Sequence, residues 1–133
     1  MLKTMINNLT VREYINKKSA NLLLGWCIEK YGPSKYNNLK TLKIQIDPNH
    51  IHFGMYEPCQ NTIILNPKRH RSLLSWCSTV IHEYTHFKQD MEKYGEYRTS
   101  YEKHPYEITC NKRGYRDQLE ARRWLIRKLC TNS

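Results

Sequence analysis

The motif His82-Glu83-Tyr84-Thr85-His86 places two histidines four residues apart, with a glutamate directly after the first. Residues i and i+4 share one face of an α-helix, so both imidazoles can reach the same metal ion. Glu83 would then lie beside a water molecule at that ion. The motif therefore predicts a helix that carries a metal site, and another element must supply a third ligand.

Residues 69–94 show the apolar periodicity of a helix around this motif. The apolar positions fall within one arc at about 100° per residue. His82 and His86 project roughly 200–240° around the helix from Val80, away from that arc. We therefore expect both histidines to face a cleft or solvent. The expected core stripe consists of Leu73, Trp76, Cys77, Val80, Tyr84 and Phe87.

The flanking segments predict an α+β fold. A helix is expected over residues 10–31, opened by a capping box at residues 10–13 and ended by Gly32 and Pro33. Three strands are expected over residues 41–47, 50–56 and 62–65, because apolar residues alternate or cluster between turn residues. We predict one compact domain over residues 1–133: an N-terminal helix, a small three-stranded sheet, the active-site helix and a C-terminal, ligand-bearing helix.

A third helix is predicted over residues 105–129, with Pro105 in its first turn. Catalytic zinc sites use three protein ligands and keep one position for water. Glu107 is our preferred third ligand, and His104 is the alternative. Asn111 lies one turn beyond Glu107 and can support a ligand by a hydrogen bond. The expected core stripe of this helix consists of Ile108, Tyr115, Leu119 and Ile126.

These residues predict a single zinc ion held by His82, His86 and Glu107. Zinc lowers the pKa of a water molecule, and Glu83 can take its proton and deliver it to a leaving amine. His and Glu also bind other divalent metals, including Mn, Co and Ni. The expected activity is zinc-dependent endopeptidase activity on a protein or peptide substrate.

Four segments carry a family resemblance: Gly54-x-Tyr56, residues 61–66, residues 79–86 and residues 104–111. Together they resemble a zincin-type, gluzincin-like metallopeptidase. The last segment is similar to the H-P-x-E-x-x-A-N segment of small bacterial and phage intracellular peptidases, with relatives in the ImmA/IrrE and SprT-like groups. Cys110 stands where these peptidases often have alanine. The metzincin class does not fit, because Gln89 and Glu92 occupy its Gly and His positions.

The resemblance implies two further features of the site. An edge strand beside the active-site helix would pair with an extended substrate, and residues Ile63, Ile64 and Leu65 are the expected strand. A polar group would also stabilise the oxyanion formed during peptide hydrolysis. Its candidates are Tyr97, Tyr101, His104 and Tyr115.

Charge and cysteine content limit the setting. The formal net charge is +10, which favours binding to an acidic partner. An alternative function is therefore nucleic-acid binding by the basic third helix, through Arg122, Arg123 and Arg127. Five cysteines without a C-x-x-C pair predict reduced thiols, and the first residues lack the long apolar segment of a signal peptide, so we expect a cytoplasmic protein. The longest apolar run, residues 22–28, is too short to cross a membrane. A zinc-binding module without catalytic activity is a further alternative.

Overall fold

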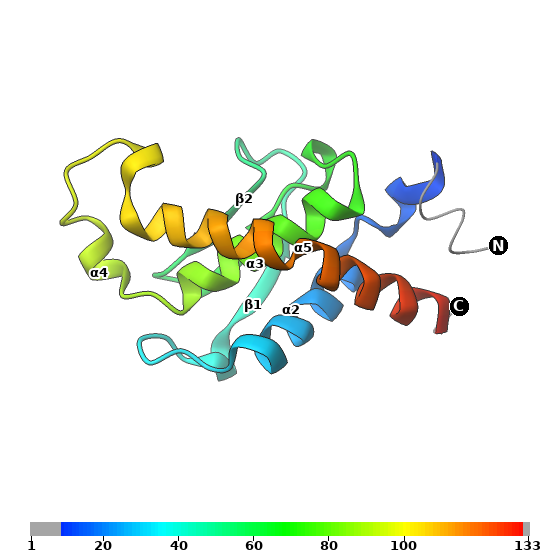
Figure 1. The fold of residues 1–133 in the computed structure, drawn as a ribbon, viewed down its shortest axis with the longest axis horizontal. Helices are drawn as coiled ribbons and strands as arrows, with labels where there is room; N and C mark the ends of the chain where they lie inside the picture. The colour runs from blue at the N-terminus through cyan, green and yellow to red at the C-terminus, as the bar shows by residue number, and fades with distance from the viewer. Residues whose placement is uncertain (1–8, 132–133) are drawn as a thin grey trace.

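Three short strands form the mixed sheet of the computed structural model, which describes residues 9–131 (Figure 1). The strands are β1 (Lys43–Ile46), β2 (Gly54–Glu57) and β3 (Thr62–Leu65). Their order is β1-β3-β2, with β3 parallel to β1 and antiparallel to β2. Since β3 is the central strand, the prediction of a substrate-pairing edge strand at Ile63, Ile64 and Leu65 is wrong. Strand order depends on pairings between distant segments, which the local alternation of residues does not encode.

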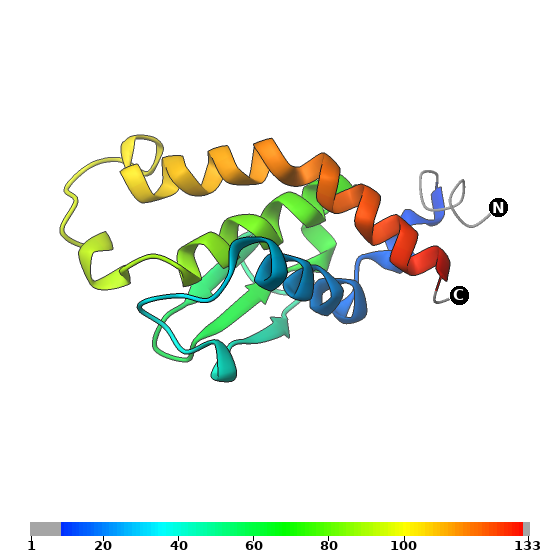
Figure 2. The same ribbon diagram turned by 60° about the horizontal axis from the view of Figure 1, so that its bottom comes forward.

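Helix α3 (Leu73–Phe87) packs on the sheet and carries the His-Glu-x-x-His motif. Ser72 caps its first turn by accepting a hydrogen bond from the Ser75 N–H. All six residues of the predicted stripe on this helix are buried, which confirms its core face. Figure 2 shows α3 between the sheet and the long helix α5 (Pro105–Thr131).

The predicted helix over residues 69–94 is interrupted. The structure instead has the 3-10 turn η3 (Pro67–Arg69), then α3, and then the short helix α4 (Met91–Tyr94). The break falls at residues 88–90, where Asp90 adopts an extended conformation and its side chain caps α4. An aspartate at this position stabilises a new helix start and so competes with continuation of α3.

Helix α5 buries a different face from the predicted one. Ile108, Tyr115 and Leu119 are exposed, and only Ile126 of the expected stripe is buried. The residues that face the protein are small or polar along most of the helix, so hydrophobic periodicity did not reveal them. They are Glu107, Cys110, Gly114, Asp117, Ala121, Leu125, Ile126 and Leu129.

Helix α2 (Lys17–Tyr31) begins later than predicted, because the 3-10 turn η1 (Leu9–Tyr14) precedes it. Its capping box uses Asn16 and Ser19 rather than residues 10–13. At its C-terminal end, the Tyr31 hydroxyl donates a hydrogen bond of 2.6 Å to Asp117 of α5. This contact joins the first and last helices of the fold.

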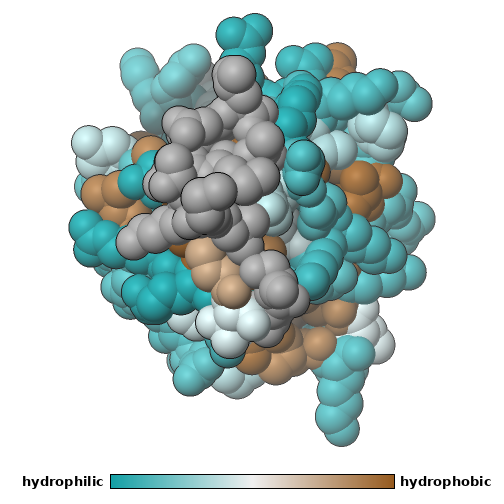
Figure 3. Space-filling model, turned by 90° about the vertical axis from the view of Figure 1, so that its right-hand side faces the viewer, coloured by the Kyte–Doolittle hydropathy of each residue, from teal (hydrophilic) through white to brown (hydrophobic). Residues whose placement is uncertain are grey.

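The apolar side chains of α2, α3, α5 and the sheet form a connected core within the described residues. The face near the chain ends is mainly hydrophilic, with separate apolar patches (Figure 3). Two further 3-10 turns, η2 (Leu39–Thr41) and η4 (Tyr101–Lys103), lie in connecting segments. Over residues 9–131, no helix has the length and apolar character needed to cross a membrane.

Candidate metal centre

A cavity of about 800 Å3 opens over the face of α3 opposite its core stripe. His82 and His86 lie on this face, with side chains 14% and 6% exposed. The cavity is bounded by β2 on one side and by α4, η4 and the first turns of α5 on the other. The two histidines therefore face a cleft, one of the two settings that their position away from the apolar arc predicted.

Both imidazoles converge on Glu107 at the start of α5. His82 Nε2 lies 3.0 Å from Glu107 Oε1, and His86 Nε2 lies 3.1 Å from the same carboxylate. The rings of His82 and His86 are 5.0 Å apart between centroids. The structure thus brings together the three residues that the sequence predicts as ligands.

Close packing of α5 on α3 places Glu107 at this level. A Cβ atom on Gly114 would lie 3.0 Å from both the backbone oxygen and the Oγ of Ser78. Glycine at this position lets the two helices approach more closely than any larger residue would. Since Gly114 and Glu107 are about two turns apart on α5, this contact sets the height of the carboxylate over α3.

Glu83 lies beside this group and is also buried. Its Oε2 is 3.9 Å from His82 Nε2, and its side chain is 8% exposed. Burial raises the pKa of Glu83, against the lowering effect of His82, His86 and the Tyr56 backbone. Strand β2 approaches this part of α3 closely, because a Cβ atom on Gly54 would lie 2.7 Å from Thr79 Cγ2. Gly54 therefore marks a close approach of β2 to α3.

Two residues that the sequence did not reveal bind the candidate ligands His86 and Glu107. Gln89 Oε1 accepts a hydrogen bond of 2.8 Å from His86 Nδ1, and the Tyr94 hydroxyl donates to Glu107 Oε2. Both were predicted to lie in one long helix. Gln89 is three residues after His86, within reach of its ring, and the break before Asp90 brings Tyr94 over the cavity. The helix-capping preference of Asp90 was the available signal.

The charges in this cluster are coupled. Burial alone would raise the pKa of Glu107, but hydrogen bonds from His82, His86 and Tyr94 outweigh it and hold the pKa well below its usual range. Burial alone would lower the pKa of His86, but the bond to Glu107 and the charges of Glu83 and Glu107 raise it. The carboxylate of Glu107 is therefore ionised, as a metal ligand must be.

The donor set fits a zinc ion. Zinc–nitrogen and zinc–oxygen bonds are about 2.0–2.2 Å, so neighbouring ligand atoms of a tetrahedral site lie about 3.3–3.5 Å apart. The separations of 3.0 and 3.1 Å between Glu107 and the two imidazoles are close to that spacing. Gln89 on Nδ1 of His86 also fixes the ring so that Nε2 points at the shared position.

Cys110 offers a different third donor. With His82 and His86 it forms a group whose donor atoms lie within 4.8 Å of one another. However, its Sγ lies 3.5 Å from His86 Nδ1, the nitrogen that Gln89 already binds. Burial also raises the pKa of the Cys110 thiol, which favours the protonated form. Glu107, at the Nε2 atoms of both rings, therefore fits the ligand role better than Cys110 does.

The remaining predicted site residues separate into two groups. Asn111 and Tyr101 line the cavity, although Asn111 is exposed and Gln89 rather than Asn111 bonds His86. His104 is buried outside the cavity lining, where its Nε2 donates to the Tyr94 backbone oxygen and its Nδ1 accepts from the Tyr106 N–H. With both nitrogens used, His104 fits neither the ligand role nor the oxyanion role. Tyr97 and Tyr115 also lie outside the cavity lining.

Comparison of the chain with family models, with curated proteins and with solved structures found no match. The function of this chain is therefore inferred from the residues of the site itself.

Proposed function

We propose that this protein is a zinc-dependent endopeptidase of the zincin type. The observation that carries the proposal is the convergence of His82 Nε2 and His86 Nε2 on the Glu107 carboxylate, with Glu83 beside them at the cavity. A zinc ion bound by these three ligands would polarise the scissile carbonyl and lower the pKa of a water molecule.

Glu83 is the general base and acid of this proposal. It takes the proton from the attacking water and delivers it to the leaving amine. Its raised pKa suits both steps, because a group that titrates nearer neutral pH can both accept and donate a proton. Tyr101 is the donor that we assign to the oxyanion. It lines the cavity, and burial together with the charge of Glu107 raises its pKa, so its hydroxyl keeps its proton.

The substrate is an extended peptide that pairs with β2. This strand is bonded to β3 on one side only, and its residues Gly54, Met55 and Tyr56 line the cavity. An unpaired strand edge offers main-chain donors and acceptors that bind a peptide independently of its side chains. In this proposal β2, rather than β3, is the edge strand that pairs with the substrate.

Metal analysis and one pair of variants test the proposal. Protein purified without chelators should contain about one zinc ion per chain. Glu83→Gln should keep the metal and reduce cleavage of an unfolded protein substrate by about 100- to 10,000-fold. Glu107→Gln should lose the metal, whereas Cys110→Ala should keep it. A metal-free preparation would contradict the proposal, and a Glu83→Gln variant that cleaves normally would favour the catalytically silent zinc module.

We place this activity in the cytoplasm, because Cys27, Cys77 and Cys110 are buried thiols that suit a reducing compartment.

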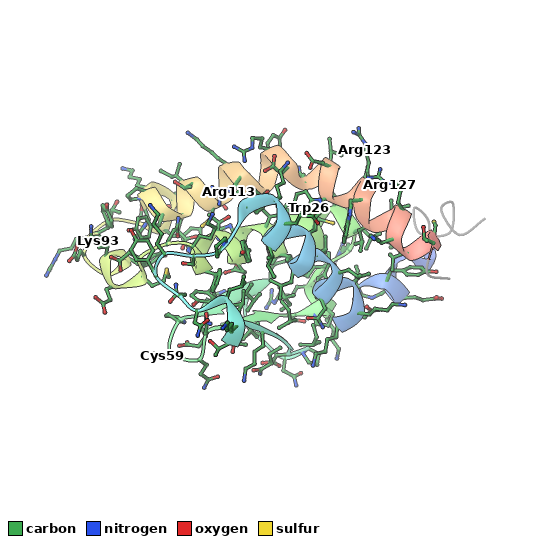
Figure 4. The ribbon with its side chains drawn as sticks, turned by 90° about the horizontal axis from the view of Figure 1, so that it is seen from below. Trp26, Cys59, Lys93, Arg113, Arg123 and Arg127 are labelled. Carbon is green, nitrogen blue, oxygen red and sulfur yellow. The ribbon has the colours of Figure 1, made fainter. Side chains whose placement is uncertain are left out.

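A nucleic-acid contact through α5 is a second candidate function. Arg123 and Arg127 project outward from α5, whereas Arg113 turns toward α2, 4.7 Å from the Tyr31 ring centroid (Figure 4). Binding that weakens steeply with salt and is lost on charge reversal of Arg122, Arg123 and Arg127 would support this candidate, and absent or salt-independent binding would remove it.

A further inference from the structure

One end of the cavity carries apolar and cationic side chains that the proposed reaction does not use. Ile51 and Phe53, in the loop before β2, line it and are 71% and 50% exposed. Arg69 of η3 lines the same end, with its guanidinium carbon 6.0 Å from the Phe53 ring centroid. Large exposed apolar side chains at the wall of a cavity are common features of binding sites.

This corner is built on a buried support. The His70 ring is fully buried under Phe53, with ring centroids 5.3 Å apart, and its Nε2 donates a hydrogen bond of 3.2 Å to the Phe53 backbone oxygen. Arg12 donates to the backbone oxygens of His70 and Lys68, at 2.9 and 3.2 Å. The backbone that carries Phe53 and Arg69 is therefore held by buried contacts.

The corner is strongly basic. Arg12 binds the backbone of residues 68 and 70, and Lys68, Arg69 and Arg71 are the neighbours of His70 in the sequence; within residues 9–131 none of these four side chains forms an ion pair. Unpaired cations at a cleft attract and orient a ligand segment of negative charge. Arg69 is the cation of this group that lines the cavity, so it is the residue placed to touch such a segment.

The direction of β2 places this corner on one side of the scissile bond. Gly54 lies against Thr79, and the Tyr56 ring lies 6.1 Å from the Phe87 ring between centroids, so β2 and α3 run in the same direction along the cavity. Phe53 is three residues before Tyr56, which is about 10 Å along an extended chain. A peptide that pairs antiparallel with β2, the more stable arrangement, runs toward Phe53 in its C-terminal direction.

We propose that Arg69 binds a carboxylate located two or three residues to the C-terminal side of the cleaved bond, while Phe53 and Ile51 pack against an apolar side chain next to it. The preferred substrate is thus a protein segment with an apolar and then an acidic residue after the cut. This inference rests on the proposed peptidase function. The carboxylate can come from an Asp or Glu side chain or from a free C-terminus, which present the same chemistry to the guanidinium.

Matched peptides that differ only in Glu, Gln or Lys at these positions test the proposal. The wild-type protein should cleave the Glu peptide about 10-fold more efficiently in kcat/KM than the Gln peptide. Arg69→Gln should cleave both with equal efficiency, and Arg69→Glu should favour the Lys peptide. Arg98→Gln, an exposed change on the loop after α4, should retain the wild-type preference. Peptides with a free or amidated C-terminus then separate the two sources of the carboxylate.

Binding to the Glu83→Gln variant, measured by fluorescence anisotropy, separates this inference from the peptidase function. Binding that favours the Glu peptide and depends on Arg69 would support the acidic subsite even if the wild-type protein cleaved nothing. Three results would overturn it: equal use of the Glu and Gln peptides by the wild type, a preference that survives Arg69→Gln, or a preference for acid on the N-terminal side of the cut. An oligonucleotide that binds more tightly than the Glu peptide, and only when Arg69 is present, would also overturn it in favour of nucleic acid.

Discussion

His70 lies shortly before α3 and His86 lies in its last turn, and both side chains are buried with both ring nitrogens hydrogen-bonded. The partners of His70 are neutral: the Ser75 hydroxyl and the Phe53 backbone oxygen. The partners of His86 are Gln89 and the carboxylate of Glu107. Burial lowers the pKa of His70, whereas in the metal-free site nearby carboxylates overcome burial and raise the pKa of His86.

The difference shows that burial does not by itself assign a role to a histidine. The charge of the partner decides whether the ring is a neutral structural element or part of an ionised cluster that can bind a cation. His70 joins the loop before β2 to the start of α3, with its ring 5.0 Å from that of Trp76 in the core. His86 instead belongs to a group of convergent donors at a cavity.

The largest expected effect is on zinc binding. His86→Ala should weaken zinc affinity by about 1000-fold, equal to about 4 kcal/mol, because it removes one of three protein ligands. Competition with a chromogenic chelator at constant pH measures this change. His70→Ala is the matched control and should remain within about threefold of the parent protein. If both variants bind zinc equally well, the two histidines do not differ as proposed.

The next effect is on folding stability. His70→Ala should lower the free energy of unfolding by about 2–3 kcal/mol, because it leaves a cavity and a buried polar group without its partner. Urea unfolding in the presence of a chelator measures this loss without a contribution from bound metal. His86→Ala should cost less under the same conditions, since Glu107 keeps hydrogen bonds from His82 and Tyr94. A larger loss for His86→Ala would reverse the comparison.

The sequence predicted the elements of the site better than their surroundings. Spacing within one helix brought His82, Glu83 and His86 to one face, because an α-helix fixes the angle between residues. The three strands were found from local alternation and clustering of apolar residues, and β3 was predicted with its observed ends, whereas the ends of β1 and β2 and the order of the strands were not predicted. The central position of β3 follows from its pairing with β1 and β2, which is set by contacts across the chain.

The buried face of α5 shows the main limit of sequence patterns. Gly114 is buried because it allows contact with Ser78, and Asp117 is buried because Tyr31 and Arg116 bind its carboxylate. Neither residue is apolar, so periodicity of hydrophobic residues favoured the wrong face. In the same way, Tyr94 reaches the site because α3 ends at Phe87 and the chain turns into α4.

A smaller effect on zinc affinity is expected from the hydrogen bond that orients Glu107. Tyr94→Phe removes the hydroxyl that donates to Glu107 Oε2 and should weaken zinc binding by about 10-fold, since partners that orient a ligand typically contribute 10- to 100-fold. Isothermal titration with zinc measures the change. Tyr97→Phe is the control, because Tyr97 lies outside the cavity lining. Equal affinities for the two variants would show that Tyr94 does not position the ligand.

The smallest expected effect is the pH dependence of the folding stability that His70 contributes. The folded protein lowers the pKa of His70 from 6.5, so the unfolded chain binds its proton more readily. The stability that depends on neutral His70 is therefore fully present above that value and is lost as the pH falls below it. The pKa of His86 is shifted in the opposite direction in metal-free protein, so the contribution of each histidine must be isolated by its own variant.

His70→Gln does not titrate, and its amide can still donate to Phe53. With metal removed, the stability of the parent relative to His70→Gln should stay constant above the pKa of the free side chain and decrease as the solution becomes more acidic. If the parent instead became more stable relative to His70→Gln as the pH falls, the folded protein would stabilise the charged His70 ring. The contrast between His70 and His86 would then fail.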